Sequence, residues 1–405
     1  MFHRMLLAAS VAAVFAVPTI ASADTATASS SSSVPTMAQI LNASGITTTG
    51  YFDVIYNHAN RDLQNGFCDR VADCQNNNLA LHQFGLQVAK QPKEGFGWLV
   101  NITAGLDAKA FESYPFNTAG SGYQQVDLTQ AYGQYAHGPV TVMAGKFTAI
   151  PGMEVIWQPS NYNTSRSILY SAEPFTETGV RANYAMNDAV TLVGGVINGW
   201  DQVSGGASGG KTVELAATVA PIKPLSFTIS DYNGKMNSAV GGFAGTAATI
   251  GGVNVVPTGD RNLLNLVVNY TPIDPLTLGL DYVNVNQRNF GQLTPASVVG
   301  TPVYGNPITA KYDGYALYAT YMFTPKWRLA LRAENFNDQN GFHFGVADTT
   351  YREGTATLSW LESDSFELRG EIRGDHASNP VFTVASGSEL SKTLTTYAVE
   401  GLYKF

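Results

Sequence analysis

Apolar and polar residues alternate strictly in the segment FELRGEIRGD at positions 366–375. One set of alternate positions carries Phe366, Leu368, Gly370 and Ile372, and the other carries Glu367, Arg369, Glu371 and Arg373. Successive side chains of a β-strand point to opposite faces, so this segment predicts a strand with a hydrocarbon face and a charged face. In a soluble sandwich the apolar face would lie in the core and the charged face in water.

The same two-residue period recurs from Ile46 to the end of the chain, most clearly at 46–56, 96–110, 276–283 and 327–336. Short turns marked by Pro, Asp or Asn alternate with longer segments rich in Gly, Ser and Asn. The short turns fall near 91–95, 137–139, 186–188, 221–224, 271–275, 324–326 and 362–364, and the long segments at 57–78, 111–122, 149–174, 201–210, 235–260, 290–309, 338–348 and 377–391. This order predicts about sixteen strands, and merging or splitting one hairpin would give 14 or 18.

The alternation of short and long connections favours a transmembrane barrel over a soluble sandwich. Outer-membrane barrels have an even number of antiparallel strands, short periplasmic turns, long external loops and apolar residues facing lipid. We therefore expect an all-β, up-and-down antiparallel barrel whose charged face, including the four charges of 367–373, lines water. A barrel of this strand number is too wide for side chains to fill, which predicts an aqueous channel.

The N-terminus predicts export. Arg4 precedes an apolar stretch from Met5 to Ala16, and the small-residue site Ala21-Ser22-Ala23 follows. This pattern is typical of a secretory signal peptide at 1–23, and its apolar stretch is shorter than the roughly 18 residues that a spanning helix needs. A Ser/Thr/Ala-rich periplasmic linker is expected at 24–44 and the barrel at 45–405.

The charge balance excludes some partners. The chain has a net charge of −8 at pH 7 with only 13% charged residues, and removal of Arg4 with the signal makes the charge −9. That acidity argues against nucleic acid or anionic lipid as a partner. The predicted partners are outer-membrane lipid and small hydrophilic solutes, in the outer membrane of a Gram-negative bacterium, and no cofactor is expected.

Two cysteines, Cys68 and Cys74, lie in one polar stretch of a predicted external loop. In an oxidising compartment a local disulfide is the favoured interpretation. A zinc site that includes His58 and His82, or two free thiols, are the alternatives. The spacing matches no standard zinc pattern, so we expect no metal.

The charged residues on the predicted inner face are the first candidate site. The expected pore-lining residues are Arg328, Arg332, Glu334, Glu353, Glu367, Arg369, Glu371, Arg373, Glu177, Arg181 and Asp281. Facing rows of opposite charge would orient dipolar solutes and set ion preference. Equally, these residues would be ordinary wall residues that pair with one another. Near balance of acids and bases on the inner face predicts weak selectivity, slightly toward cations.

The segment 149–174 is the second candidate site. It is the third long loop, and it carries more apolar residues than the Gly/Ser-rich loops. Such a segment should bury its apolar residues, either inside the barrel or against neighbouring loops or subunits. Folding inward would place Glu154, Trp157, Arg166 and Glu173 at a constriction. Arg166 would then tie the loop to Glu154 or Glu177.

Other functions leave weaker signals. The sequence carries no nucleophile elbow, zinc-protease or phosphate-loop motif and no suggestive Cys/His arrangement, so we expect no enzyme activity. Twenty tyrosines leave room for an aromatic slide for sugars or organic acids, with Tyr51, Tyr135, Tyr312 and Tyr318 as inward candidates. A third alternative is a non-transport adhesin or structural barrel with a blocked lumen.

The segments GKFTAIPGMEVI at 145–156 and NYNTSRSILYSAEPFTETGVRANYAMNDAVTLVGGVINGWD at 161–201 resemble the β-barrel porin-2 family of OmpL-like porins. GYFDVIYNHAN near the start and QAYGQYAHGPVTVMAGKF at 130–147 are similar to early strands of that family. The positions that fit its pattern are Gly145, Lys146, Phe147, Gly152, Glu154, Asn163, Ser165, Arg166, Ser167, Pro174, Phe175, Gly179, Asn198, Gly199 and Trp200. The resemblance implies an outer-membrane barrel that passes small solutes, but it supplies no substrate.

The last strand, TYAVEGLYKF, ends on Phe405. A terminal aromatic residue of this kind resembles the signal that the outer-membrane assembly machinery reads, so that machinery is an expected partner. A homotrimer is a further possibility, as in many general porins. The favoured interpretation is a porin for passive diffusion of small hydrophilic solutes.

Overall fold

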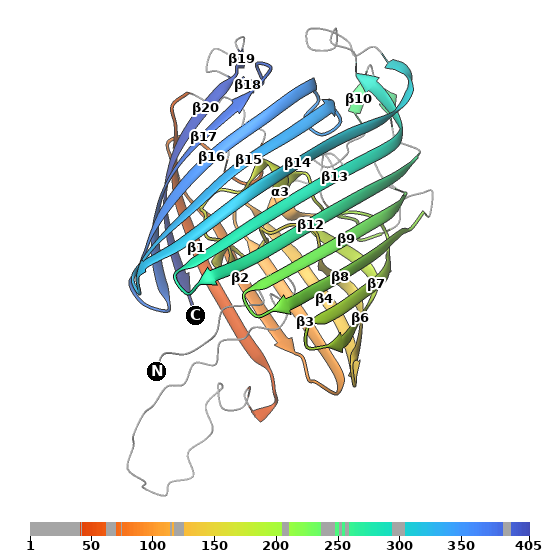
Figure 1. Cartoon of the computed structure of the whole chain (residues 1–405), viewed down its shortest axis with the longest axis vertical. Helices are drawn as coiled ribbons and strands as arrows, with labels where there is room; N and C mark the ends of the chain where they lie inside the picture. The colour runs from red at the N-terminus through yellow and green to blue at the C-terminus, as the bar shows by residue number, and fades with distance from the viewer. Residues whose placement is uncertain are drawn as a thin grey trace, which may run out of the picture.

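A computed structural model describes residues 41, 43–61, 70–73, 75–113, 116, 125–204, 210–235, 248–250, 253–255, 259–293, 304–383 and 390–405. Sixteen antiparallel strands close into one barrel, each paired with its neighbours in the chain, and the last paired with the first. They run obliquely around the barrel (Figure 1). The predicted all-β up-and-down barrel and its number of strands are confirmed. The signal peptide, most of the 24–44 linker, Cys68 and Cys74 lie outside the described residues.

The barrel strands are β1 (Thr47–Ala59), β2 (Asn78–Lys90), β3 (Gly95–Ala104), β4 (Val126–His137), β5 (Val140–Thr148), β6 (Thr176–Asn187), β7 (Val190–Ile197), β8 (Thr212–Ile222), β9 (Leu225–Lys235), β12 (Asp260–Ile273), β13 (Leu276–Leu293), β14 (Tyr304–Thr324), β15 (Trp327–Asn340), β16 (Ala347–Leu361), β17 (Phe366–Ala377) and β20 (Thr393–Lys404). Two small hairpins, β10 (Ala248–Ile250) with β11 (Val253–Val255) and β18 (Phe382–Thr383) with β19 (Leu390–Ser391), belong to the long loops. The helical turns are α2 (Ala108–Phe111), η3 (Gln158–Ser160) and α3 (Ile168–Ser171).

The seven short turns fall where the sequence predicts them. Each joins two strands at one end of the barrel, for example Lys90 to Gly95 and Leu361 to Phe366. The C-terminus lies at the same end, and the two loop hairpins lie at the other (Figure 1). Long connections at one end and short turns at the other are typical of outer-membrane barrels.

The barrel closes where β1 meets β20. Tyr51 to Ala59 pair with Lys404 to Thr396. Just beyond these pairs, the amide of Gly50 donates to the carbonyl of Phe405, and the amide of Phe405 donates to the carbonyl of Gly50, each at 2.9 Å. The Phe405 ring lies against Gly50, where a Cβ would stand 2.5 Å from that ring. The final aromatic residue therefore completes the barrel seam.

Side-chain exposure shows that the barrel is apolar outside and polar inside. In β17, Leu368 and Ile372 are exposed at 39% and 48%, whereas Glu367, Arg369, Glu371 and Arg373 are buried. Exposed aromatic residues such as Trp327, Tyr403 and Phe405 gather near the short-turn end. Such a girdle marks a membrane interface. Within the described residues no helix is long and apolar enough to cross a membrane.

Two details of the predicted pattern were wrong. The register of β3 against β4 shifts between Asn101 and Thr103, and this irregularity reverses the alternation along β4. Tyr135 therefore faces outward, 46% exposed, and stacks on Phe96. The strand expected at 96–110 ends at Ala104, and Lys109 lies on the exposed side of helical turn α2.

The lipid-facing assignment predicts a depth-dependent effect of charge. Ile372 pairs with Ala356 near mid-strand, whereas Leu368 pairs with Trp360 close to the short-turn end. Arginine on the lipid face costs about 2–4 kcal/mol near the midplane and about 0–1 kcal/mol near the interface. Ile372→Arg should therefore destabilise the barrel more than Leu368→Arg, as measured by urea unfolding in liposomes. Equal effects, or the reverse order, would contradict this placement of the membrane.

Candidate functional site

The eleven charged side chains expected to line the pore all lie on the inner face of the barrel. Each is nevertheless largely covered, with at most 7% of its surface exposed. They are Arg328, Arg332, Glu334, Glu353, Glu367, Arg369, Glu371, Arg373, Glu177, Arg181 and Asp281. The inner wall is therefore not a row of charges open to water, because other parts of the chain cover it.

Ion pairs run both along and across the strands of this inner wall. Arg332 Nε lies 3.0 Å from Glu353, and Arg369 lies 2.7 Å from Glu367 and 3.2 Å from Glu400. Arg373 pairs with Asp375 at 2.7 Å, and Arg328 pairs with Glu367. Asp375 is a wall residue that the sequence analysis missed, although it continues the same alternation beyond Arg373.

The segment 149–175 lies inside the barrel against this wall, and Figure 1 shows its turn α3 within the ring of strands. Wall carboxylates accept hydrogen bonds from consecutive backbone amides of the segment. Glu371 accepts from Thr164 and Ser165 at 2.7 and 3.0 Å. Glu334 accepts from Ile168 and Leu169 at the same two distances. Each carboxylate thus holds two neighbouring N–H groups.

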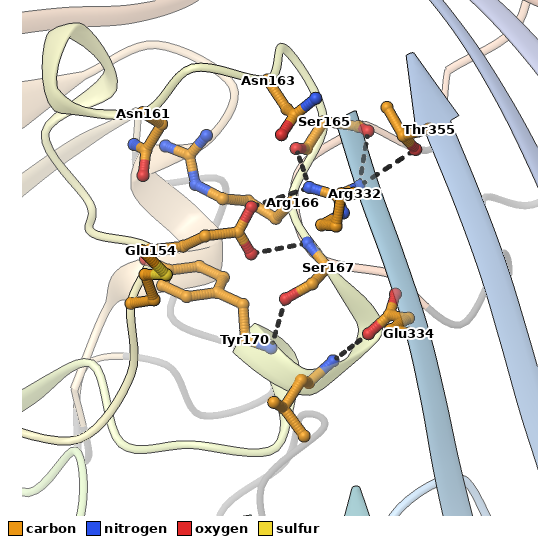
Figure 2. Close-up of polar contacts among 12 residues, drawn as sticks. Glu154, Asn161, Asn163, Ser165, Arg166, Ser167, Tyr170, Arg332, Glu334 and Thr355 are labelled. Atoms are coloured by element: carbon orange, nitrogen blue, oxygen red, sulfur yellow. Dashed lines mark hydrogen bonds and ion pairs between the residues drawn. The ribbon is translucent and has the colours of Figure 1, made fainter. Parts of the chain in front are cut away.

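Wall arginines bind the same segment through its carbonyls. Arg332 donates to the carbonyl of Ser165 and to Glu154, each at 2.7 Å (Figure 2). Arg373 donates to the carbonyl of Arg166. Glu154 also accepts from the amide of Ser167 at 2.7 Å. The wall therefore binds 164–169 as it would bind an extended peptide, through both donors and acceptors of its backbone.

Burial explains why these contacts must all be made together. A buried carboxylate or guanidinium without partners costs several kcal/mol, whereas each charge-assisted hydrogen bond returns about 1.5–3 kcal/mol. The buried wall charges need the backbone N–H and C=O groups of the segment as hydrogen-bond partners. The segment needs the wall charges for the same purpose. We therefore expect one well-defined position for 164–169 and not a freely moving flap.

The four residues expected at the constriction do not share one open surface. Glu154 is 7% exposed, Arg166 3% and Glu173 2%. Trp157 packs edge-on against Tyr51, with ring centroids 4.5 Å apart. The four side chains therefore do not form the open constriction that was expected, because the wall charges draw the polar side of the segment toward them. Glu154 and Glu173 also line a small cavity beside the segment, whereas Trp157 and Arg166 do not.

Arg166 has different partners from those predicted. It donates to Gln158 and to the carbonyl of Ile156, and its guanidinium lies 5.5 Å from the centroid of the Tyr170 ring. Glu154 pairs with Arg332, and Glu177 pairs with Arg181 at 3.0 Å. Arg166 therefore shapes the loop from within, while Arg332 and Arg373 attach it to the wall.

Glu173 anchors the other end of the segment. It accepts from Asn265 at 2.9 Å, and Asn265 also donates to Asp281 at 2.7 Å. Asp281 accepts in turn from the amide of Met153 at 2.7 Å. Burial, together with the neighbouring carboxylates of Asp281 and Glu154, raises the pKa of Glu173 well above its usual range. Glu173 is therefore held as the neutral acid.

A second inward loop, 341–346, was missed by the sequence analysis. Asp338 accepts from the amides of Phe342, His343 and Phe344 at 2.8–3.2 Å and so folds the loop into a tight turn. Phe342 and Phe344 are buried with Tyr312, Phe336 and Tyr351. The only sequence signal was Phe-His-Phe between two glycines in a loop that is otherwise small and polar.

The loop 341–346 brings a histidine next to a serine. His343 Nε2 lies 3.0 Å from Ser171 Oγ, but that hydroxyl donates to the carbonyl of Ile168 at 2.6 Å. Burial and the charge of Arg261 lower the pKa of His343 to about 3, so it is neutral. The pair lies in a packed aromatic cluster and not in a cleft. This arrangement favours packing over catalysis.

The opposite wall is less covered. A cavity of about 100 Å³ separates the segment, at 148–156 and 173–175, from strands β5 to β8. Its wall side is lined by Met143, Arg181, Asn183, Val193 and Thr218. Arg181 is held by Glu214 at 2.8 Å and by Glu177. A water occupies about 10–15 Å³ by such a measure, so several waters fit.

Within the described part of the chain, no cluster of three or more His, Cys, Asp or Glu side chains could hold a metal ion. The proposed disulfide between Cys68 and Cys74 falls outside the described residues and stays a prediction.

Sequence comparison decides the family. Residues 45–405 match the family described as "Putative beta-barrel porin-2, OmpL-like". The chain belongs to this family. The match covers the whole barrel, in agreement with the resemblance seen in the sequence. A comparison with curated proteins found no match.

Solved structures share the fold of this OmpL-like porin. A loop-deletion mutant of OmpT, an outer membrane protein of Vibrio cholerae, superposes with a TM-score of 0.56 at 11% identity, over 89% of this chain and 99% of the other. The outer membrane channel DcaP of Acinetobacter baumannii gives 0.56 at 12% identity, with 89% and 97% coverage. An anion-selective porin from Comamonas acidovorans gives 0.56 at 11% identity, with 89% and 99% coverage. The chain is thus a barrel of the Gram-negative outer membrane.

The neutral state of Glu173 predicts how the loop responds to pH. A carboxyl whose pKa is raised in the folded state binds more protons than in the unfolded state, so its contribution to stability falls as pH rises through that range. Hydrogen exchange at 149–175, corrected for intrinsic rates, should show protection falling as pH rises above the ordinary carboxyl range. Glu173→Gln cannot ionise and should flatten that slope. Identical slopes in the two proteins would contradict the assignment.

The hydrogen bonds that Glu371 accepts predict that its removal destabilises the segment locally. Glu371→Ala removes the carboxylate that accepts from the amides of Thr164 and Ser165. The free energy of opening 160–170 should fall by about 3–6 kcal/mol, from two charge-assisted hydrogen bonds. Hydrogen exchange at the backbone amides of 160–170 measures this free energy of opening. Glu362→Ala, on an exposed short turn, is the control and should change nothing. Unchanged protection in Glu371→Ala would show that the wall does not hold the segment.

Proposed function

We propose that this porin forms a water-filled channel for passive diffusion of small hydrophilic solutes across the outer membrane. The observation that carries the proposal is the one-sided attachment of 149–175. Most of its polar anchors lie on β1, β9, β12–β17 and β20, while the cavity lies along β5–β8. The exception is the amide of Phe175, which donates to Asp201 just after β7. The passage would run between the segment and that second wall.

The lining of the passage supports weak charge selectivity. Arg181 lies between Glu177 and Glu214, so two carboxylates flank one guanidinium. Glu154 and Glu173 face the cavity from the loop side, where Glu154 is paired with Arg332. We expect a small preference for cations. The anion-selective porin with the same fold shares 11% identity, so its selectivity does not transfer.

Substrate selectivity is the rival form of this proposal. The aromatic slide considered from the sequence finds no support in its four tyrosines. Tyr135 lies outside, and Tyr51, Tyr312 and Tyr318 lie beneath the loops. Met143, Val193 and the apolar residues of 150–156 give the cavity instead an aliphatic lining. Saturable flux of one solute class in liposomes would favour the rival, and a smooth decline with solute size favours the general pore.

The expected partners are outer-membrane lipid, small solutes and the outer-membrane assembly machinery, which would read the strand ending at Phe405. We propose a homotrimer as the assembly. The support is limited to the fold, since one structure of OmpT from Vibrio cholerae is a trimer form with a TM-score of 0.53 at 11% identity. No enzymatic role is proposed, because the buried Ser171 and His343 lie outside any cleft.

Asn183 tests the passage directly. It lies on β6, lines the cavity and is partly exposed. Purified protein in planar bilayers should show stepwise conductance, and a salt gradient should give a small reversal potential of the cation-selective sign. Asn183→Asp should increase that potential, and Asn183→Lys should reverse it.

The two substitutions at one position control for each other, because a general change in folding would not produce shifts of opposite sign. Absence of conductance steps in the folded protein would favour a structural or adhesive barrel. Conductance with unchanged selectivity in both variants would place the passage elsewhere in the lumen.

A further inference from the structure

The outer surface of the barrel has a hollow over β13 to β20. A groove of about 800 Å³ lies on the lipid-facing side, where its outward-pointing lining includes Leu317, Leu331, Ala333, Gly354, Ile372 and Gly374. The groove is made by small residues in register. Ala333 pairs with Gly354, Gly354 with Gly374, and Gly374 with Thr395, so four neighbouring strands carry small residues at one level. A Cβ added at Gly354 or Gly374 would meet nothing within 4 Å.

The next row of outward-facing residues, toward the short-turn end, also lines the groove. There Leu331, Ala356 and Ile372 lie side by side, and Tyr397 continues the row on β20. The small Ala356 lies between the larger Leu331 and Ile372, so the surface is lowered between these two side chains. The lining is almost wholly apolar, as a lipid-facing surface requires.

The next outward-facing row, on the side of the long loops, carries the guanidinium of Arg352 and the imidazole of His376. Asn335 pairs with Arg352, Arg352 with His376, and His376 with Thr393. Arg352 and His376 are exposed and point outward, on the side of the barrel where the long loops lie. No hydrogen bond or ion pair of either side chain occurs within the described residues. The nearest outward acid on β14, Asp313, already accepts from Asn337 and Gln339 at 3.1 and 2.8 Å.

The height of this row places it at the membrane surface. Trp360, in the aromatic girdle of the short-turn end, and Arg352 are both outward residues of β16. Their eight-residue separation at about 3.3 Å per residue, with a strand tilt of about 40°, corresponds to roughly 20 Å along the barrel axis. The apolar band of such barrels is about 25 Å tall. Arg352 and His376 therefore lie where lipid headgroups of the outer leaflet begin.

We propose that this groove binds one phosphorylated lipid of the outer leaflet, with its phosphate on Arg352 and His376 and an acyl chain over Gly354 and Gly374. Arginine presents a planar fork of donors that matches phosphate, and a histidine ring adds another donor. The exposed guanidinium of Arg352 supplies the charge complementarity, and the open space above the two glycines supplies room for the chain. The site is separate from the lumen and does not depend on solute passage.

Native mass spectrometry tests the proposal with a defined probe. The full-length protein is refolded in detergent with purified lipid A, which carries phosphates, or with enzymatically dephosphorylated lipid A. We expect about one retained lipid A per barrel and at least about tenfold weaker retention of the dephosphorylated form. Arg352→Glu combined with His376→Glu should abolish the difference. Gly354→Leu should weaken retention of both lipids by filling the groove.

Arg288→Glu is the matched control. Arg288 is an exposed arginine on β13, where it lies 3.9 Å from Asp260 and away from the groove. The Arg288→Glu variant should retain lipid A as the unchanged protein does. Heat-modifiable mobility reports folding of every variant, and the comparison of the two lipids on the unchanged protein stands even if a variant does not fold.

Equal retention of both lipids by the unchanged protein, or full retention by Arg352→Glu/His376→Glu, would overturn the proposal. So would dissociation of an oligomer by Gly354→Leu without loss of lipid, which would make the groove a contact between copies of the chain. Conductance is measured separately, and all variants should conduct normally. Loss of lipid binding with normal conductance therefore distinguishes failure at the groove from failure of the channel.

Discussion

The structure depends on the closure of one hydrogen-bonded ladder. In hydrocarbon every backbone N–H and C=O needs a protein partner, and only a strand order without edges provides this for a sheet. Here β20 returns to β1, and Gly50 and Phe405 exchange backbone hydrogen bonds at the seam. Closure forces one face of each strand toward lipid and the other toward the lumen. The two-residue alternation of the sequence follows from that division.

The polar interior creates a second requirement, which the loops meet. A porin has no apolar core in the usual sense, yet its wall charges are buried here because chain segments cover them. The carboxylates of Glu334 and Glu371 and the guanidinium groups of Arg332 and Arg373 bind the backbone of 164–169. These hydrogen bonds between the wall side chains and the backbone of 164–169 hold the segment against one side of the barrel. The cavity of about 100 Å³ lies on the opposite side, along β5–β8, where we propose that solutes pass.

Local order was predictable from the sequence, and long-range contact was not. Alternation, turn residues and loop lengths identified the strands, the faces of β17 and the inward position of Glu334 or Arg373. The irregularity in β4 was not visible, so Tyr135 was assigned to the wrong face. The partner of Arg166 could not be found either, because Gln158 and Ile156 reach it through the shape of the loop. The outer groove depends on Ala333, Gly354 and Gly374 meeting across strands, which requires the register.

The central claim is that the open passage runs beside β6 and not beside β16, and cysteine accessibility tests it most directly. In a background where Cys68 and Cys74 are replaced by serine, Asn183→Cys faces the cavity, whereas Thr357→Cys lies beneath Asn163, which donates to Thr357 at 2.7 Å. A charged methanethiosulfonate reagent added during planar-bilayer recording should reduce the current through Asn183→Cys and leave Thr357→Cys unchanged. Block at Thr357→Cys without block at Asn183→Cys would contradict the account.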